Sequence, residues 1–166
     1  MTGLVIEKLN RLHKVEAFDC GNLPLNRYLL VHALQNQSAN AAQTYVCVDG
    51  SVVAGYASLA VGSADASDAP ERLRKGLART PVPAMILARL AVDVGWQVRG
   101  VGASLLKDAA ERTLQAADIA GIRALVIHAK DEAARRYYLQ FGFHDGFQDP
   151  LHLYVLTKEL RALIGG

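Results

Sequence analysis

Cysteine is scarce in this 166-residue chain, and its two copies, Cys20 and Cys47, stand far apart. Neither has a second cysteine or a histidine pair nearby at metal-ligand spacing, so the sequence predicts no metal site. An unpaired cysteine is most often a small, buried, apolar residue. Two such cysteines without an export signal indicate a reducing compartment, and we expect a cytoplasmic protein.

Long apolar runs are missing as well. The N-terminal stretch MTGLVIEKLNRLHK contains no run of signal-peptide length. No segment approaches the roughly 20 continuous apolar residues that a membrane helix needs, so we expect no membrane span. The formal net charge is only +2, which excludes a chain that wraps nucleic acid with its whole surface. Any basic surface must therefore be local.

Length and patterning predict one domain over residues 1–166. Strands are expected at 4–9, 84–94, 122–130 and 151–160, and at two apolar runs on either side of Asp49-Gly50. The Asp-Gly pair between these two runs predicts a β-hairpin, because both central residues of such a turn need positive φ. Helices are expected after the N-caps Asn22 and Asp131, the second ending at Gly142, and from Gly102 onward. A short helix is expected from Pro70 to Leu77. This order predicts a mixed sheet with helices on both faces, and a ligand where the two inner strands each lead into a helix.

Two glycines, Gly100 and Gly102, stand between the buried strand at 84–94 and an amphipathic helix whose apolar face holds Leu105, Leu106, Ala109, Ala110 and Leu114. A helix start exposes backbone N–H groups and the positive end of the helix dipole, and glycine lets a phosphate approach the backbone. The turn therefore predicts an anion site suited to a pyrophosphate. Position 105 is not a glycine and Gly-Lys-Ser/Thr is absent, which excludes the Rossmann and P-loop patterns.

The spacing Gln97-x-x-Gly100-x-Gly102 resembles the signature of the GNAT superfamily of acetyl-CoA-dependent N-acetyltransferases. The segment AARRYYLQFGF resembles the GNAT helix in which a tyrosine lies beside the coenzyme A sulfur, here Tyr138 rather than Tyr137. The resemblance implies an α/β (α+β) fold with a mixed, mostly antiparallel sheet. It also implies a splayed strand whose backbone binds pantetheine and a glycine turn that holds the pyrophosphate. The residues implied in binding acetyl-CoA are Ala91, Val92, Gln97, Val98, Arg99, Gly100, Val101, Gly102 and Ala103.

Three segments, FDCGNLPLNRYL, TYVCVDGSVVAGYASLA and PVPAMILARLAVDVGWQVRGVGASLLKDA, together look like the GNAT toxins of bacterial toxin–antitoxin pairs. The first segment is not a general GNAT feature and carries most of the added specificity. The resemblance implies acetylation of the α-amine of aminoacyl-tRNA, which blocks translation. It also implies neutralisation by a ribbon-helix-helix antitoxin and, often, a homodimer. A local basic stretch could meet RNA phosphates, although a solvated basic loop explains it equally well; it consists of Arg72, Arg74, Lys75 and Arg79.

Acetyl transfer requires a donor for the developing oxyanion and an acid for the leaving thiolate, a role that the resemblance gives to Tyr138. No base is evident: Asp93 is interpreted as ending its strand, and His128 as a core histidine. An α-amine titrates near neutrality and needs little help to lose its proton. Asp131 stands where the family often has an asparagine that contacts coenzyme A, so that contact is in doubt.

Two other functions stay open. A GNAT that acetylates a small-molecule amine would share the whole coenzyme A argument. A non-catalytic GNAT fold that binds acyl-CoA or a protein partner is disfavoured only by Tyr138.

Overall fold

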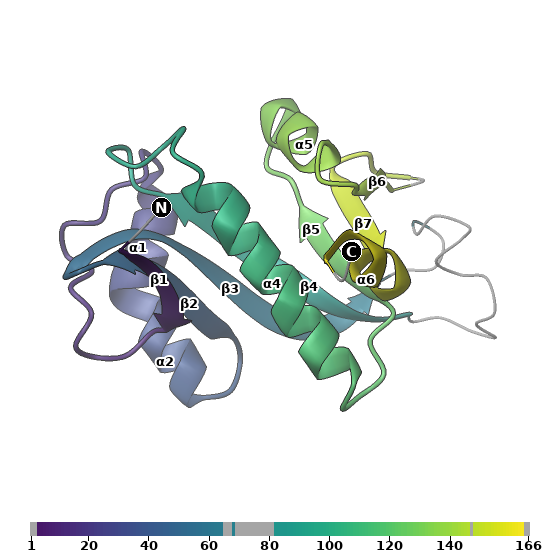
Figure 1. Cartoon of the computed structure of the whole chain (residues 1–166), viewed down its shortest axis with the longest axis horizontal. Coiled ribbons are helices and arrows are strands. Elements are labelled where there is room, and N and C mark those ends of the chain that lie inside the picture. Colours follow the sequence, from purple (N-terminus) through teal and green to yellow (C-terminus); the bar gives the residue numbers. More distant parts are fainter. Residues whose placement is uncertain (1–2, 65–67, 69–81, 147, 165–166) are drawn as a thin grey trace. The chain divides into compact units, whose positions relative to one another are not determined.

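The computed structural model describes residues 3–64, 68, 82–146 and 148–164. Its hydrogen-bonded strands follow the order β1-β2-β3-β4-β5-β7-β6. The strands are β1 (Leu4–Lys8), β2 (Gln43–Asp49), β3 (Val52–Ala64), β4 (Val82–Val92), β5 (Ala124–His128), β6 (His144–Asp145) and β7 (His152–Leu156) (Figure 1). The helices are α1 (Leu23–Arg27), the π-helical η1 (Tyr28–His32), α2 (Ala33–Ser38), α4 (Val101–Ala117), α5 (Glu132–Leu139) and α6 (Thr157–Ile164). The predicted mixed α/β class is confirmed, because β4 and β5 pair in parallel while β1–β2, β2–β3, β5–β7 and β6–β7 pair antiparallel.

The chain divides into two compact units. The first unit comprises Met1–Ala60 and Ala88–Ala109, and the second comprises Val61–Leu87 and Ala110–Gly166. In the described part of the chain, no helix is both long and apolar enough to cross a bilayer.

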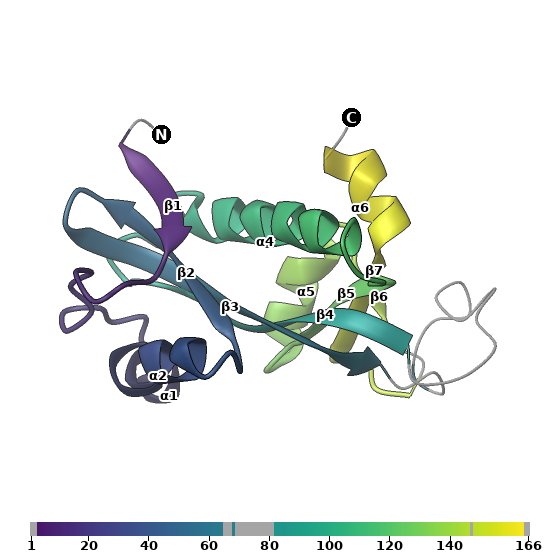
Figure 2. The same cartoon turned by 90° about the horizontal axis from the view of Figure 1, so that it is seen from below.

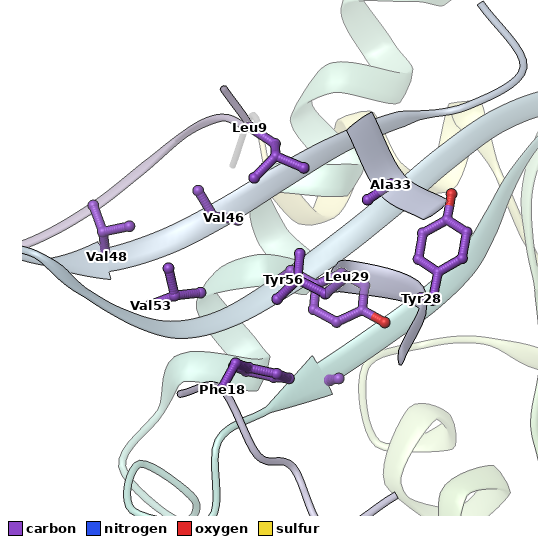
Figure 3. Packing of buried hydrophobic residues seen from close by; sticks show 10 residues of the cluster. Leu9, Phe18, Tyr28, Leu29, Ala33, Val46, Val48, Val53 and Tyr56 are labelled. Carbon is purple, nitrogen blue, oxygen red and sulfur yellow. The ribbon is translucent and has the colours of Figure 1, made fainter. Parts of the chain in front are cut away.

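The core of the first unit lies between the helices α1, η1 and α2 and one face of β2 and β3 (Figures 2 and 3). Alternation along β2 turns Val46 and Val48 to this face, because successive strand residues point to opposite sides. The start of α4 covers the other face of the same strands (Figure 2). The buried cluster consists of Leu9, Phe18, Tyr28, Leu29, Ala33, Val46, Val48, Val53, Tyr56 and Ala91.

The first helix begins where the sequence predicts. The side chain of Asn22 accepts a hydrogen bond from the Leu25 N–H at 3.1 Å, and Pro24 occupies the first turn. The helix then passes through the π-helical η1, in which the Ala33 N–H bonds the Tyr28 carbonyl. This wider turn carries His32 to an exposed position and puts Ala33 in the core.

The predicted hairpin is confirmed, but its turn lies one residue later than predicted. Asp49 pairs with Val52, so Gly50 and Ser51 are the two central residues. Gly50 has φ +60°, whereas Asp49 is still strand and Ser51 is not at positive φ. A glycine at the first central position followed by an ordinary residue is the requirement of a type II′ turn, not of the type I′ turn implied by Asp-Gly.

Gly55 allows α4 to approach β3. A Cβ at this position would lie 2.9 Å from the Ala91 carbonyl oxygen, 2.9 Å from Leu105 Cδ1 and 3.0 Å from Val101 Cγ1. Since Val101 is the first residue of α4, Gly55 sets where that helix begins above the sheet.

The second unit contains the parallel ladder, which pairs Ala84–Leu87 with Ala124–Ile127. β7 then pairs antiparallel with the other edge of β5, from Ala124↔Leu156 to His128↔His152. Its buried apolar cluster consists of Ala64, Val82, Ala84, Ala124, Val126, Tyr154 and Leu156.

The C-terminal prediction was wrong in part, because the strand expected at 151–160 ends at Leu156 and α6 begins at Thr157. The Glu159 carboxylate accepts a hydrogen bond from the Leu156 N–H at 3.0 Å, and Thr157 Oγ1 donates to the Arg123 carbonyl at 3.2 Å. These side-chain bonds turn the chain out of the strand, and Leu160 is then buried by helical rather than alternating spacing. The two-residue β6 was not predicted, and the helix expected from Pro70 to Leu77 lies outside the described residues.

The α5 prediction is confirmed at its start. Asp131 Oδ1 accepts a hydrogen bond from the Ala134 N–H at 2.8 Å. At the other end, the helix stops at Leu139 and Gly142 follows with φ +97°, its N–H bonded to the Leu139 carbonyl. Glycine is suited to this left-handed position.

Candidate active site

The glycine turn lies between β4 and α4 in the first unit, as the sequence predicts. Gly100 has φ +84°, a left-handed conformation that glycine adopts without strain. The N–H of Ser104 bonds the Gly100 carbonyl at 3.0 Å. Because helix geometry leaves the first N–H groups of any helix without intrahelical acceptors, those of Val101, Gly102 and Ala103 are available to an external anion. A second left-handed residue, Val98, has φ +60° and a fully exposed side chain.

The two polar side chains of the turn fix its backbone. Gln97 Nε2 donates to the carbonyl of Val92 at 3.0 Å and lies 3.4 Å from the carbonyl of Cys20. The Arg99 guanidinium lies over the Trp96 ring, 4.2 Å from its centroid, and donates to the Gly95 carbonyl at 3.3 Å. The glutamine of the signature therefore ties the turn back to the end of β4.

Asp93 joins this turn to the N-terminal element FDCGNLPLNRYL. Its Oδ2 accepts a hydrogen bond from the Asp19 N–H at 3.0 Å, while its Oδ1 accepts one from the Gly95 N–H at 2.8 Å. The Val94 N–H bonds the Asp19 carbonyl at 2.8 Å. The expectation that Asp93 ends its strand is confirmed, since β4 stops at Val92.

The N-terminal element is itself held by side-chain hydrogen bonds. Asp19 Oδ1 accepts hydrogen bonds from Asn26 Nδ2 and from the Gly21 N–H, both at 2.9 Å, and these bonds lower the pKa of the Asp19 carboxyl. Asn26 Oδ1 in turn accepts from the Cys20 N–H at 2.8 Å. The element is thus a structured loop whose polar residues bond one another.

The end of β4 runs past the parallel ladder. The ladder stops at Leu87, whereas β4 continues through Ala91 and Val92. The Val92 carbonyl is already engaged by Gln97, and Ala91 is buried in the first unit. The last residues of β4 therefore lie beyond the residues that pair in the parallel ladder.

Tyr138 is buried in the second unit, with Phe143 edge-on to its ring at 6.1 Å between centroids. Burial, with a smaller contribution from Tyr137, raises the pKa of the Tyr138 hydroxyl, which is therefore protonated at neutral pH. Tyr137 is half-buried and packs against Phe141 at 5.1 Å. This contact makes Tyr137 a packing residue.

The interpretation of His128 as a core histidine was wrong. His128 is exposed at the end of β5, and its ring stacks on that of His152 with 3.9 Å between centroids. His152 is bonded to Asp68, a buried carboxylate. Sequence reasoning missed Asp68 and His152 because they are 84 positions apart and follow no motif.

Sequence reasoning also missed Arg89 on β4. Its guanidinium lies 3.6 Å from the centroid of the buried Tyr28 ring, a cation–π contact. Within the described ranges, no three acidic, histidine or cysteine side chains gather into a group that could hold a metal ion. Cys47 is buried and Cys20 half-buried, both as free thiols. The basic residues Arg72, Arg74, Lys75 and Arg79 lie outside the described residues.

A parallel inner strand that leads through a left-handed glycine turn into a helix N-terminus is typical of α/β proteins that bind a phosphate-bearing ligand. Comparison with known proteins makes the class specific: the acetyltransferase (GNAT) domain matches residues 40–145, and the chain belongs to the GNAT acetyltransferase family.

Individual relatives match nearly the whole chain. A tRNA-acetylating toxin of Mycobacterium tuberculosis is 46% identical over 152 residues, which cover 91% of this chain and 90% of the relative. AtaT complexed with acetyl-methionyl-tRNAfMet has a TM-score of 0.88 and 26% identity, covering 96% of this chain and 98% of that one. A tyrosine-to-phenylalanine variant of AtaT bound to the C-terminus of the antitoxin AtaR and acetyl-CoA has a TM-score of 0.83 and 25% identity, covering 99% of both chains.

Proposed function

We propose that this chain is an acetyl-CoA-dependent N-acetyltransferase toxin that acetylates the α-amine of aminoacyl-tRNA and thereby blocks translation. The observation that carries the proposal is the hydrogen bond from the Asp19 N–H to the Asp93 carboxylate, with 3.0 Å between nitrogen and oxygen. It fastens the toxin-type N-terminal element to the GNAT turn, so both features belong to one arrangement. The similarity to a tRNA-acetylating toxin over 91% of the chain supports it.

In this proposal the turn binds the pyrophosphate of acetyl-CoA through the first N–H groups of α4. Since Gly100 and Gly102 have no Cβ, the phosphates can approach the backbone. Backbone groups of the last β4 residues receive the pantetheine and polarise the acetyl carbonyl. The proposed binding residues are Ala91, Val92, Gln97, Val98, Arg99, Gly100, Val101, Gly102 and Ala103. Gln97 and Arg99 act by holding the turn, since Gln97 bonds the Val92 carbonyl at the end of β4 and Arg99 bonds the Gly95 carbonyl.

Tyr138 acts as the general acid. The amine nitrogen attacks the thioester carbonyl carbon, the C–N bond forms, and the C–S bond breaks. The leaving thiolate takes the phenolic proton, and the tyrosinate regains one from the new amide nitrogen. A phenol is protonated at neutral pH and can therefore supply this proton.

The proposal also includes the partners of the protein, its location in the cell and the bounds of its domain. We infer an antitoxin as protein partner, because AtaT is bound to the antitoxin AtaR in a solved relative. The resemblance to GNAT toxins implies that this antitoxin is a ribbon-helix-helix protein. We also infer pairing of two copies, one acetyltransferase domain over residues 1–166 and a cytoplasmic location, which suits both a tRNA substrate and free thiols.

The test is incubation of the protein and acetyl-CoA with charged or uncharged tRNA, followed by mass analysis of the tRNA 3′ end. We expect an added acetyl group on the charged tRNA only. Acetylation of free small amines with charged tRNA left untouched would establish the small-molecule alternative instead. Expression with and without an adjacent ribbon-helix-helix gene should show growth arrest only in its absence.

The basic stretch has its own test. Neutralising two of Arg72, Arg74, Lys75 and Arg79 should weaken tRNA binding and flatten its salt dependence, because each lost phosphate contact reduces counterion release. The affinity for acetyl-CoA should stay the same.

A further inference from the structure

A polar cluster in the second unit has no part in the mechanism above. Asp68 is only 5% exposed, and its carboxylate accepts four hydrogen bonds. Oδ1 accepts the N–H groups of Gln148 at 2.7 Å and Asp149 at 2.8 Å; Oδ2 accepts the Tyr154 hydroxyl at 2.6 Å and His152 Nδ1 at 3.0 Å. A buried carboxylate with this many donors is held in one position.

The ionisation of Asp68 determines the orientation of His152. Burial disfavours the charged carboxylate, but hydrogen bonds from Tyr154, from the two N–H groups and from His152 outweigh it and lower the pKa of Asp68. An ionised carboxylate only accepts, so His152 Nδ1 must carry a proton. The other ring nitrogen, Nε2, lies 3.4 Å from Asp149 Oδ2. His152 is therefore fixed between two carboxylates.

His128 is positioned by this fixed ring. The two histidines face each other across β5 and β7, with centroids 3.9 Å apart and ring planes 12° apart. His128 is the last residue of β5, at the carboxyl end of a strand in the parallel ladder, where ligands of such sheets bind. Four residues later the chain enters α5, the helix that carries Tyr138.

The groups around His128 keep its ring neutral. Partial desolvation and the neighbouring His152 lower the pKa of His128, against the opposing charges of Asp149 and Asp68. A neutral imidazole with an exposed edge can accept a proton near pH 7. The amine that it would serve titrates at about 7.7–8.0, so much of it is protonated at that pH.

We propose that His128 is the proton acceptor for the acceptor amine, with His152 and Asp68 as positioning residues. This inference rests on the proposed function. The ammonium gives one proton to the His128 ring, which passes it to solvent, and the freed nitrogen lone pair attacks the thioester carbonyl. Tyr138 gives its phenolic proton to the leaving thiolate and then takes the second proton from the nitrogen. The two residues therefore divide the proton transfers between them.

The test compares pH profiles of wild type and His128→Gln. The substrate is a charged tRNA analogue whose amino acid is joined by an amide, because it resists alkaline hydrolysis. We expect kcat to fall by on the order of 100-fold at pH 6.5. The deficit should nearly vanish at pH 9.5, where the amine is already deprotonated. Added imidazole should restore part of the lost rate in His128→Ala, and the affinity of either variant for coenzyme A should equal that of wild type.

A loss of rate that is the same at every pH, or an unchanged rate, would overturn the assignment of His128. His144→Gln is the matched control, since it removes a histidine of the same unit that pairs with Glu159 at 2.8 Å; its pH profile should match that of wild type. The wild type tests the proposed function separately. If the wild type acetylates only a small amine, the ratio of wild-type to variant kcat at each pH is measured with that amine. These ratios then decide the role of His128 independently of the proposed tRNA substrate.

Discussion

The carboxylate of Asp93 holds the backbone of Asp19, 74 positions earlier in the chain, by a 3.0 Å hydrogen bond, and with its other oxygen it holds Gly95 at 2.8 Å. One side chain therefore orients both the N-terminal loop and the start of the glycine turn. Two separate sequence motifs become neighbours through this residue.

Replacing Asp93 should loosen both segments. We expect Asp93→Ala to lower the free energy of unfolding by about 1 kcal/mol, because two backbone donors lose a charged acceptor. Asp93→Asn should lose less, since it keeps one acceptor oxygen. Urea denaturation measures the effect, and Glu111→Ala, on the exposed side of α4, should change stability by no more than a few tenths of a kcal/mol. Equal stability of Asp93→Ala and wild type would show that the hydrogen bonds of Asp93 do not stabilise the two segments.

A methyl group at Gly55 should displace the start of α4. We expect Gly55→Ala to cost about 1–3 kcal/mol of stability through overpacking, because its Cβ would meet the Ala91 carbonyl, Leu105 and Val101. The affinity for coenzyme A, measured by calorimetry, should fall with it. Gly121→Ala is the control, since a Cβ there meets nothing within 4 Å. If both variants bind coenzyme A equally well, the position of α4 does not depend on this contact.

A bulky side chain at Gly102 should block the pyrophosphate. We expect Gly102→Val to fold and to bind acetyl-CoA much more weakly, because its side chain would occupy the space in front of the first N–H groups of α4. A thermal melt establishes folding, and equilibrium titration gives the dissociation constant. An unchanged constant in the folded variant would rule out this turn as the acetyl-CoA site.

Removing the Tyr138 hydroxyl should abolish most turnover. Tyr138→Phe keeps the ring packed against Phe143, so we expect a normal melt with kcat reduced by roughly 100- to 10,000-fold, the usual contribution of general acid catalysis. Tyr137→Phe is the matched control and should stay near the wild-type rate. The reverse pattern would mean that the other tyrosine of the pair is the acid.

Acid should remove the contribution of Asp68 to stability. Its pKa is lower in the folded protein than the unfolded value of about 3.9, so its stabilisation is complete above that value and is lost as the pH falls through the folded pKa. We expect Asp68→Asn to be less stable than wild type at pH 7, and the gap to narrow below about pH 4. Urea midpoints at pH 7, 5 and 3 measure the gap. A gap that is constant with pH would show that ionisation of Asp68 does not stabilise the fold.

The sequence by itself determined the features that depend on local backbone chemistry. Asn22 and Asp131 cap their helices because a short polar side chain reaches an N–H three residues ahead, which needs no distant partner. The left-handed Gly100 before α4 follows equally from glycine's freedom at positive φ. The two helix caps were predicted at the correct residues, and so was the place of the glycine turn.

The tertiary structure alone decided what depends on strand register and on partners far along the chain. Strand pairing, not the Asp-Gly dipeptide, puts Gly50 and Ser51 at the centre of the hairpin turn. Side-chain bonds to Leu156 and Arg123 end β7 early and start α6. His128 became an exposed, stacked residue because β7 places His152 opposite it, and His152 is fixed by Asp68 from 84 positions away. Contacts at such separations are set by how the sheet assembles, and local residue preferences do not encode them.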